Sequence, residues 1–247
     1  MSYITTNINT DGFGSQYQRI IESYIFSKYN KYIFHYRPFS SVEHNYSNDP
    51  LFLEKKEKMV NLIDNIENID NSKLNNYKYI PNIDMIRFFE KNIDLYCEGE
   101  HMNFIKKCFW ENKDKNFFKN EKVNVAVHIR RINSHDGSYE NAGNRVNTPN
   151  SYFFNIINAL REKYKNKELL FHIYSQGIPS MFSMFVNQTD IILHLNSDFD
   201  DTFIGMVAAD VLVTSPSSLS YVAGLLSDGE VWYKQFWHPP RKTWIVC

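Results

Sequence analysis

Strand and helix patterns alternate along the second half of this chain, and this alternation constrains the fold more than any other feature. The run VNVAVHI at 123–129 is rich in β-branched residues, which indicates a strand largely buried in a sheet. Alternation of this kind predicts a parallel sheet, and so a Rossmann-like lobe over 122–247. The other strands are expected at 169–175, 190–196, 211–214 and 230–233, and the helices at 151–164, 178–186, 199–209 and 217–226.

The first half has a different pattern, which predicts a lobe that is mainly helical. After a glycine-containing turn at 11–14, apolar residues at helical spacing predict a helix over 13–30, followed by a strand at 32–36. We therefore predict an α/β fold with two lobes: a short one over 1–121 with a small α/β start, and the Rossmann-like one over 122–247. The other segments expected are a loop at 38–49, helices at 51–65, 84–97 and 102–118, and a polar loop at 132–148.

Composition narrows the function classes. A formal net charge of −1 and a pI near 6.7 give no general attraction to nucleic acid or anionic membranes, whereas a small anion needs only a local basic patch. Cys97, Cys108 and Cys247 are widely spaced and fit a reducing compartment better than a disulfide framework or a zinc site. No apolar run is long enough for a membrane span, so a soluble, cytoplasmic protein is expected. The 16% of aromatic residues suits a stacking or sugar-binding cleft, although any single ring can simply fill the core.

Two adjacent arginines, Arg130 and Arg131, directly follow the strand at 123–129. In open α/β sheets, ligands bind outside the carboxyl ends of the strands. The guanidinium fork donates paired hydrogen bonds to phosphate oxygens, which indicates a phosphate site. The alternative is a pair of arginines held by surface carboxylates.

A hydroxyl-rich turn, TSPSSLS at 214–220, follows a second buried strand and precedes a helix. The amino end of a helix attracts anions through its free N–H groups and its dipole. A serine there is also the commonest helix cap, which is the simpler interpretation of this turn taken alone. Two such turns at the carboxyl edge of one sheet nevertheless predict a site for a nucleoside diphosphate.

A short acidic cluster, Asp198-Phe199-Asp200-Asp201, has two interpretations. It could be the DxD motif by which many glycosyltransferases hold a divalent metal. Because it immediately precedes a predicted helix, we favour a helix start, where carboxylates face the positive end of the dipole. One carboxylate, Asp201, could still accept hydrogen bonds from a guanine base.

Three motifs occur in an order that resembles GDP-fucose-dependent fucosyltransferases. They are Gly12-Phe13-Gly14-Ser15-Gln16, then His128-Ile129-Arg130-Arg131, then ADVLVTSPSS at 209–218. Those enzymes carry a G-x-G-N-Q-like turn, an H-x-R-R-G-D strand end and a late A-D-x-x-(V/I)-x-x-(S/T)-x-S-S turn. Related sequences occur among glycosyltransferase-like proteins of large DNA viruses, whose Asn-rich composition is similar, and this resemblance would place the protein in a host cytoplasm.

The resemblance implies a GT-B-like enzyme that needs neither metal nor cofactor. The GDP-sugar donor would bind the C-terminal lobe, and a glycan or protein hydroxyl would accept the sugar at the N-terminal lobe. Arg130 would clamp the β-phosphate with Arg131 in support, and His128 would contact the donor. The diphosphate would be held by Ser215, Ser217 and Ser218. The cleft would be closed from the other lobe by Gly12, Gly14 and Gln16.

The chain departs from the family pattern directly after Arg131. Ile132-Asn133 stands where Gly-Asp is expected, and Asp136 could substitute through a longer loop. The departure motivates a second hypothesis, a transferase of the same fold with another nucleotide-sugar donor. The short N-terminal lobe motivates a third, a catalytically silent nucleotide- or glycan-binding module.

An inverting transfer also needs a base to deprotonate the acceptor hydroxyl. The candidates are Glu43, His44, His135 and Asp136. We choose Glu43, because it lies in the lobe expected to carry the acceptor; an ordinary surface carboxylate is the alternative.

Overall fold

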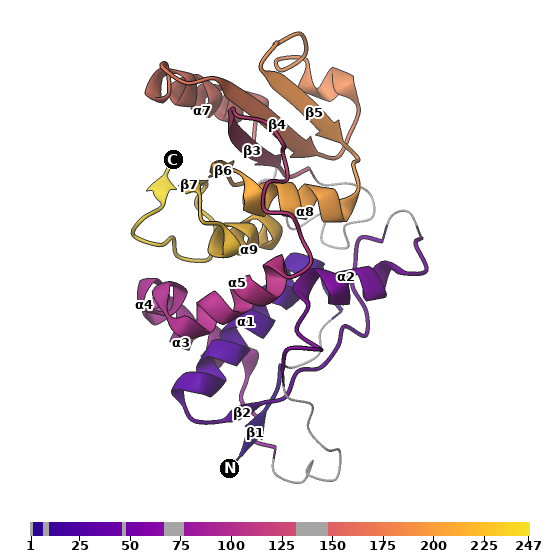
Figure 1. Ribbon diagram of the computed structural model, residues 1–247, viewed down its shortest axis with the longest axis vertical. Coiled ribbons are helices and arrows are strands. Elements are labelled where there is room, and N and C mark those ends of the chain that lie inside the picture. Colours follow the sequence, from indigo (N-terminus) through magenta and orange to yellow (C-terminus); the bar gives the residue numbers. More distant parts are fainter. Residues whose placement is uncertain (1, 7–9, 46–47, 67–76, 132–147) are drawn as a thin grey trace. The chain divides into compact units, whose positions relative to one another are not determined.

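A computed structural model describes residues 2–6, 10–45, 48–66, 77–131 and 148–247. The chain forms two compact units, Met1–Asp114 and Lys115–Cys247 (Figure 1). The lobe boundary expected between residues 121 and 122 stays a prediction, and it falls in the segment that joins α5 (Glu100–Trp110) to β3 (Val123–Ile129).

The second unit is built on a parallel sheet. Among the described residues this sheet has six strands in the order β5-β4-β3-β6-β7-β8. It confirms the predicted α/β class and the Rossmann-like character of this half. The other strands are β4 (Leu169–Ser175), β5 (Ile191–Leu195), β6 (Val211–Val213), β7 (Glu230–Tyr233) and β8 (Ile245–Val246).

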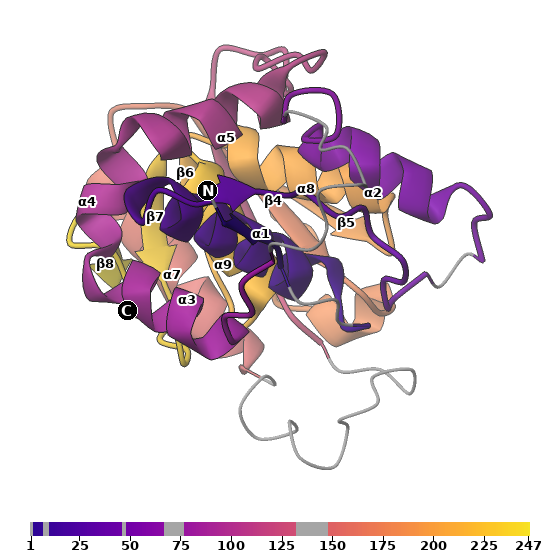
Figure 2. The ribbon, with the colours of Figure 1, turned by 90° about the horizontal axis from the view of Figure 1, so that it is seen from below.

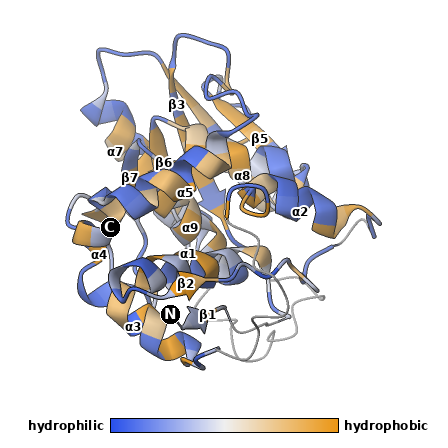
Figure 3. Ribbon diagram, turned by 60° about the horizontal axis from the view of Figure 1, so that its bottom comes forward, coloured by the Kyte–Doolittle hydropathy of each residue, from blue (hydrophilic) through white to orange (hydrophobic). Residues whose placement is uncertain are grey.

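Helices cover both faces of this sheet, which explains why its strands are rich in apolar residues. One face packs against α7 (Asn150–Lys163), and α8 (Phe199–Ala208) and α9 (Ser218–Leu226) lie on the other (Figure 1). Every residue of β3 after Val123 is buried, as expected of a strand covered on both sides. Figure 3 shows hydrophobic residues concentrated on the strands. The core under α7 includes Val125, Val127 and Ile129 of β3 with Phe153, Ile157 and Leu160 of α7.

The neighbouring strands β3 and β6 form the switch point of the sheet. The chain leaves β3 toward α7 on one face and leaves β6 toward α9 on the other (Figure 1). A crevice opens outside the carboxyl ends of two such strands, because their connections diverge. Arg130 and Ser215 both follow these two strand ends, so the fold assigns them to the position where open α/β sheets bind ligands.

The first unit is organised around α1 (Phe13–Tyr29), which is buried along most of its length. This helix lies between α3 (Asn82–Lys91) and α5 (Figure 2). A short parallel pair, β1 (Tyr3–Ile4) and β2 (Ile33–Phe34), completes the α/β start that the sequence predicts.

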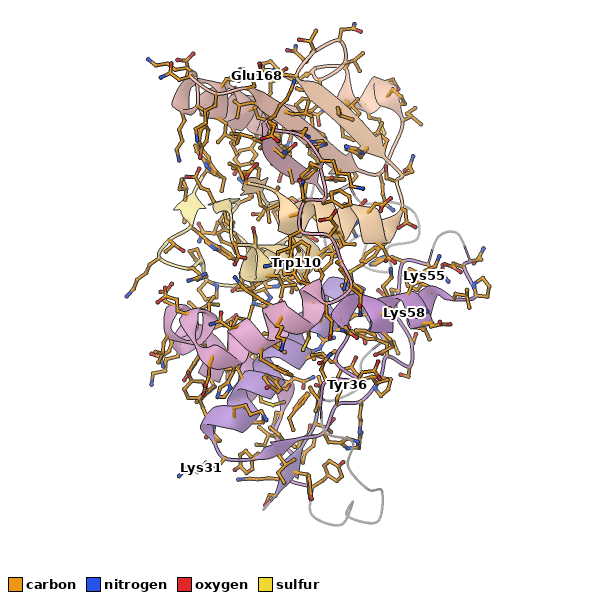
Figure 4. All side chains as sticks on the ribbon, viewed as in Figure 1. Lys31, Tyr36, Lys55, Lys58, Trp110 and Glu168 are labelled. Carbon is orange, nitrogen blue, oxygen red and sulfur yellow. The ribbon has the colours of Figure 1, made fainter. Side chains whose placement is uncertain are left out.

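The segment after β2 is tied to α2 (Phe52–Val60) through one carboxylate. Glu57 accepts hydrogen bonds from the Tyr36 hydroxyl at 2.8 Å and from the Phe39 backbone N–H at 2.5 Å. Tyr36 is labelled in Figure 4. These bonds fix the start of the loop that carries Glu43.

Several predicted elements are wrong in extent. The helix expected over 84–97 is divided at Asn92, whose φ of −137° and ψ of 43° separate α3 from α4 (Ile93–Glu98). The helix expected over 102–118 ends at Trp110, because Glu111 is extended with ψ of 130°. The segment 178–186 forms only a 3₁₀ turn at Pro179–Phe182, and α2 stops at Asn61, which is left-handed with φ of 50°. The strands β1 and β8 were not predicted, because two residues give no periodicity.

The polar loop expected at 132–148 lies, apart from Thr148, outside the described residues. In the described part of the chain, none of the helices combines the length and the apolar character that crossing a bilayer would require.

Candidate functional site

The ends of β3 and β6 are joined directly by hydrogen bonds. The Arg130 backbone N–H donates to the Ser215 hydroxyl at 3.2 Å, and the same hydroxyl lies 3.0 Å from His128 Nδ1. Arg130 and Ser215 are 85 residues apart in the sequence. The two turns that were predicted separately therefore lie together at the switch point.

His128 supports this site as a neutral ring. Burial lowers the pKa of His128 to about 3, with a smaller contribution in the same direction from the nearby Arg130 charge. A ring that stays neutral and is a weak base is suited to hold the Ser215 hydroxyl rather than to accept a proton from a substrate. The side chain is buried, so it supports the strand end from inside the protein.

The serine turn is held in shape by a residue that the sequence did not single out, Ser220. Its hydroxyl donates to the Ser215 carbonyl at 3.1 Å and to the Ser217 carbonyl at 3.3 Å, and it lies 3.3 Å from the Ser215 N–H. Ser220 is fully buried, so these bonds are shielded from water. The sequence could have indicated this role, because four serines lie within 215–220 and the last of them, Ser220, is about one helical turn beyond Ser217 at the helix start.

Ser217 caps α9, which confirms the helix-cap interpretation of this turn. Its side chain accepts a hydrogen bond from the Leu219 N–H at 3.3 Å. Ser217 and Ser218 are half-buried at the amino end of the helix. The cap and an anion site are compatible, because one side chain satisfies only one of the N–H groups at a helix start.

The two adjacent arginines are placed differently. The Arg131 guanidinium donates to the Thr148 carbonyl at 2.9 Å, to the Arg130 carbonyl at 3.2 Å and to the Asn150 side chain. It also lies 5.6 Å from the centre of the Phe182 ring. These contacts tie the end of β3 to the start of α7 and to the 3₁₀ turn.

Arg130 is half-buried beside the serine turn. Its Nη1 donates to the Arg131 carbonyl at 2.7 Å.

The acidic cluster is a helix start, as we favoured. The Asp198 carboxylate accepts hydrogen bonds from the N–H groups of Asp200 at 2.8 Å and Asp201 at 3.3 Å, and so caps α8. Asp201 is exposed, and its charge acts on two nearby rings. Burial lowers the pKa of His194, and the Asp201 charge opposes this shift. Burial raises the pKa of Tyr174, and the Asp201 charge adds to this shift. Within the described ranges, no group of three or more His, Cys, Asp and Glu side chains is arranged to hold a metal ion.

In the first unit, the glycine turn is joined to the loop that carries the candidate base. Gly12 and Glu43 form a parallel bridge, in which the Glu43 N–H donates to the Asp11 carbonyl at 3.3 Å. The His44 ring covers Gly12 so closely that a Cβ there would lie 3.1 Å from it. The sequence did not indicate that Gly12, Glu43 and His44 would meet.

Gln16 holds the same turn from inside. Its amide donates to the Asp11 carbonyl at 2.6 Å and to the Ser41 carbonyl at 2.8 Å. Gln16 and Gly14 are both buried. Gln16 therefore fixes the position of the loop that leads to Glu43. The other candidate bases, His135 and Asp136, lie outside the described residues.

Ser215→Ala should lower the free energy of unfolding by about 1–3 kcal/mol, because it removes the hydrogen-bond partner of the buried His128 ring and of the Arg130 N–H. Urea unfolding at pH 7 measures the change. Ser183→Ala, at an exposed serine of the same unit, is the control. Equal unfolding midpoints for the two variants would contradict the role given to this hydroxyl.

Comparison with known proteins gives a fold likeness at low identity. No protein-family model matches the sequence, and none of the curated proteins compared matches it. The chain is similar to the selenomethionine structure of the fucosyltransferase NodZ from Bradyrhizobium, at 10% identity and a TM-score of 0.46. It is also similar to the NodZ α-1,6-fucosyltransferase soaked with GDP-fucose, at 11% and 0.49, and co-crystallised with GDP, at 13% and 0.47. Each likeness covers 92% of this chain and 92% of the other.

Proposed function

We propose that the protein is a fucosyltransferase-like glycosyltransferase with a GT-B-like fold, which transfers a sugar from a GDP-sugar to a hydroxyl of a glycan or protein. The observation that carries the proposal is the hydrogen-bonded joint between Arg130, Ser215 and His128 at the switch point of the sheet. It brings Arg130 next to the amino end of α9, at the position where a nucleotide would bind. The motif resemblance supplies the choice of GDP and fucose.

In this proposal the diphosphate is held by charge and by N–H groups. The Arg130 guanidinium donates to the β-phosphate, and the amino end of α9, with Ser217 and Ser218, receives the remaining oxygens. When the bond to the sugar breaks, negative charge grows on the leaving diphosphate, and these preorganised donors stabilise it. No divalent cation is required for that step, because the arginine and the helix dipole supply the positive charge.

The acceptor hydroxyl must lose a proton, and we propose Glu43 as the base. Its carboxylate is about half exposed, and Oε2 lies 4.0 Å from His44 Nε2. The backbone bridge between Gly12 and Glu43 positions the loop that carries this carboxylate, which would accept the proton while the sugar is transferred with inversion. We further propose that Asp201 accepts hydrogen bonds from the guanine base.

Nucleotide titration tests the proposal. GDP and GDP-fucose should raise the melting temperature of the full chain, whereas UDP and UDP-sugars at the same concentration should leave it nearly unchanged. Stabilisation by UDP alone would favour the same fold with another donor, in line with Ile132-Asn133 in place of Gly-Asp. Binding of GDP-fucose without hydrolysis or transfer across a glycan panel would favour a silent binding module.

A manganese requirement would overturn the metal-independent mechanism. GDP binding should therefore be measured with EDTA and with Mn²⁺. The two affinities should agree if Arg130 and α9 supply the positive charge.

A further inference from the structure

The segment between β7 and β8 is attached by hydrogen bonds at the carboxyl edge of the sheet. The Lys234 N–H donates to Thr214 Oγ1 at 3.0 Å, next to the serine turn. The Tyr233 hydroxyl donates to the His238 carbonyl at 2.7 Å, and the Tyr221 hydroxyl of α9 donates to the Pro239 carbonyl at 2.9 Å. These three bonds attach both ends of the tetrapeptide 235–238 to β6, β7 and α9.

This anchored segment presents Trp237 to solvent. The side chain is 64% exposed, whereas Trp244 is 7% exposed and packs against Tyr221 and Tyr233. The Trp237 ring lies on Phe236, with ring centres 4.0 Å apart and planes 30° apart. A single exposed apolar residue needs no explanation, but an indole backed by a second ring on a fixed loop is a preformed flat surface.

The position of this surface relates it to the candidate donor site. Trp237 follows Lys234 by three residues, so at most roughly 10 Å of chain separates it from the residue that is bonded to Thr214 at the start of the serine turn. In the sheet order, β7 lies on one side of the β3–β6 pair, and β5, whose end leads to Asp201, lies on the other. A donor whose diphosphate lies at the pair and whose base faces Asp201 would extend its sugar toward β7.

We propose that Trp237, backed by Phe236, is a stacking surface for a sugar ring. The inference rests on the proposed function, because the direction of the sugar follows from the placement of the diphosphate. One face of a pyranose ring carries C–H groups, and the electron-rich face of an indole attracts such groups while shielding them from water. The ring can belong to the transferred sugar or to the acceptor glycan, and the chemistry of recognition is the same.

Calorimetry on the full chain separates these two sources. GDP, GDP-fucose, cellotetraose, maltotetraose and chitotetraose are titrated into the wild type and Trp237→Ala, the tetrasaccharides with and without GDP. The variant should bind GDP as the wild type does and should lose about tenfold in affinity for at least one sugar probe, the loss typical of one stacking ring. A loss for GDP-fucose but not GDP identifies the donor sugar, and a loss for a tetrasaccharide identifies the acceptor.

Two further variants make the test specific. Trp237→Phe should retain most of the affinity for the sugar probe but lose the change in tryptophan fluorescence that accompanies binding. A purely structural role of Trp237 would not produce such a change in fluorescence. Tyr79→Ala removes an aromatic side chain of similar exposure, 76%, in the other unit and should bind every probe as the wild type does.

The outcomes against the inference are distinct from those against the proposed function. Wild-type affinity of Trp237→Ala for every sugar probe would overturn the stacking surface, as would a wild-type chain that binds GDP but no sugar. Failure of the wild type to bind GDP would instead contradict the proposed donor.

Discussion

Replacing Arg130 by alanine should weaken GDP binding by about one hundredfold, because the guanidinium would make charge-assisted hydrogen bonds of roughly 1.5–3 kcal/mol each to the diphosphate. The backbone of Arg130 keeps its bond to Ser215 in the variant, since the N–H and not the side chain makes it. The strand end and the serine turn should therefore stay joined. Calorimetry gives the affinity, and thermal unfolding without nucleotide checks that the fold is retained.

Two other variants show whether the effect belongs to the geometry of this arginine. Arg130→Lys keeps the positive charge but loses the planar fork, so it should restore only part of the affinity. Arg161→Ala removes an arginine from the same unit, where it is paired with Asp190 at 2.7 Å, and should leave GDP binding unchanged. Unchanged affinity in Arg130→Ala would remove the phosphate site from the proposal.

The adjacent arginines illustrate what the sequence could predict and what it could not. The pair was placed at the carboxyl edge because a seven-residue run rich in β-branched residues precedes it, and this strand has the bounds 123–129 that the sequence predicts. The contacts of the second arginine were not predictable. Arg131 is tied to Thr148 and Asn150 by the way α7 begins, which no local pattern around the pair encodes.

The contacts within the candidate site depend on register between distant segments. The bond from Arg130 to Ser215 requires β3 and β6 to be neighbours in one particular alignment, with Val127 opposite Val213. A single sequence gives the period of each strand but not its partner, because the intervening strands can be ordered in several ways. The bridge between Gly12 and Glu43 was missed for the same reason, whereas the caps of α8 and α9 were predicted because capping is local.

Between pH 5 and pH 9, the stability of the wild-type chain should fall by on the order of 3 kcal/mol through a single buried carboxyl group, that of Glu22 on α1. Burial raises the pKa of Glu22 to about 8, with a smaller contribution from the negative charge of Glu90, while the bond from Gln18 and the Arg19 charge act in the opposite direction. The Gln18 amide donates to Oε1 at 3.0 Å, and Oε2 has no hydrogen-bond partner among the described residues.

The sign follows from proton binding. The folded chain keeps the Glu22 proton up to about pH 8, whereas the unfolded chain releases it near the ordinary value of 4.5. The folded state is therefore favoured fully below pH 4.5, and the contribution is lost as the pH rises through 8. Urea unfolding at intervals between pH 5 and pH 9 measures the decline.

Glu22→Gln carries a neutral amide of nearly the same shape as the protonated carboxyl group. It should match the wild type near pH 5, exceed it at pH 9 and lose most of the decline between them. Glu54→Gln changes an exposed carboxylate of the same unit that is paired with Lys58, and it should keep the wild-type dependence on pH. A Glu22→Gln variant with the wild-type decline would show that another group controls it. Because α1 begins at the glycine turn, a chain stabilised in this way would also hold the Gly12–Glu43 bridge intact at alkaline pH.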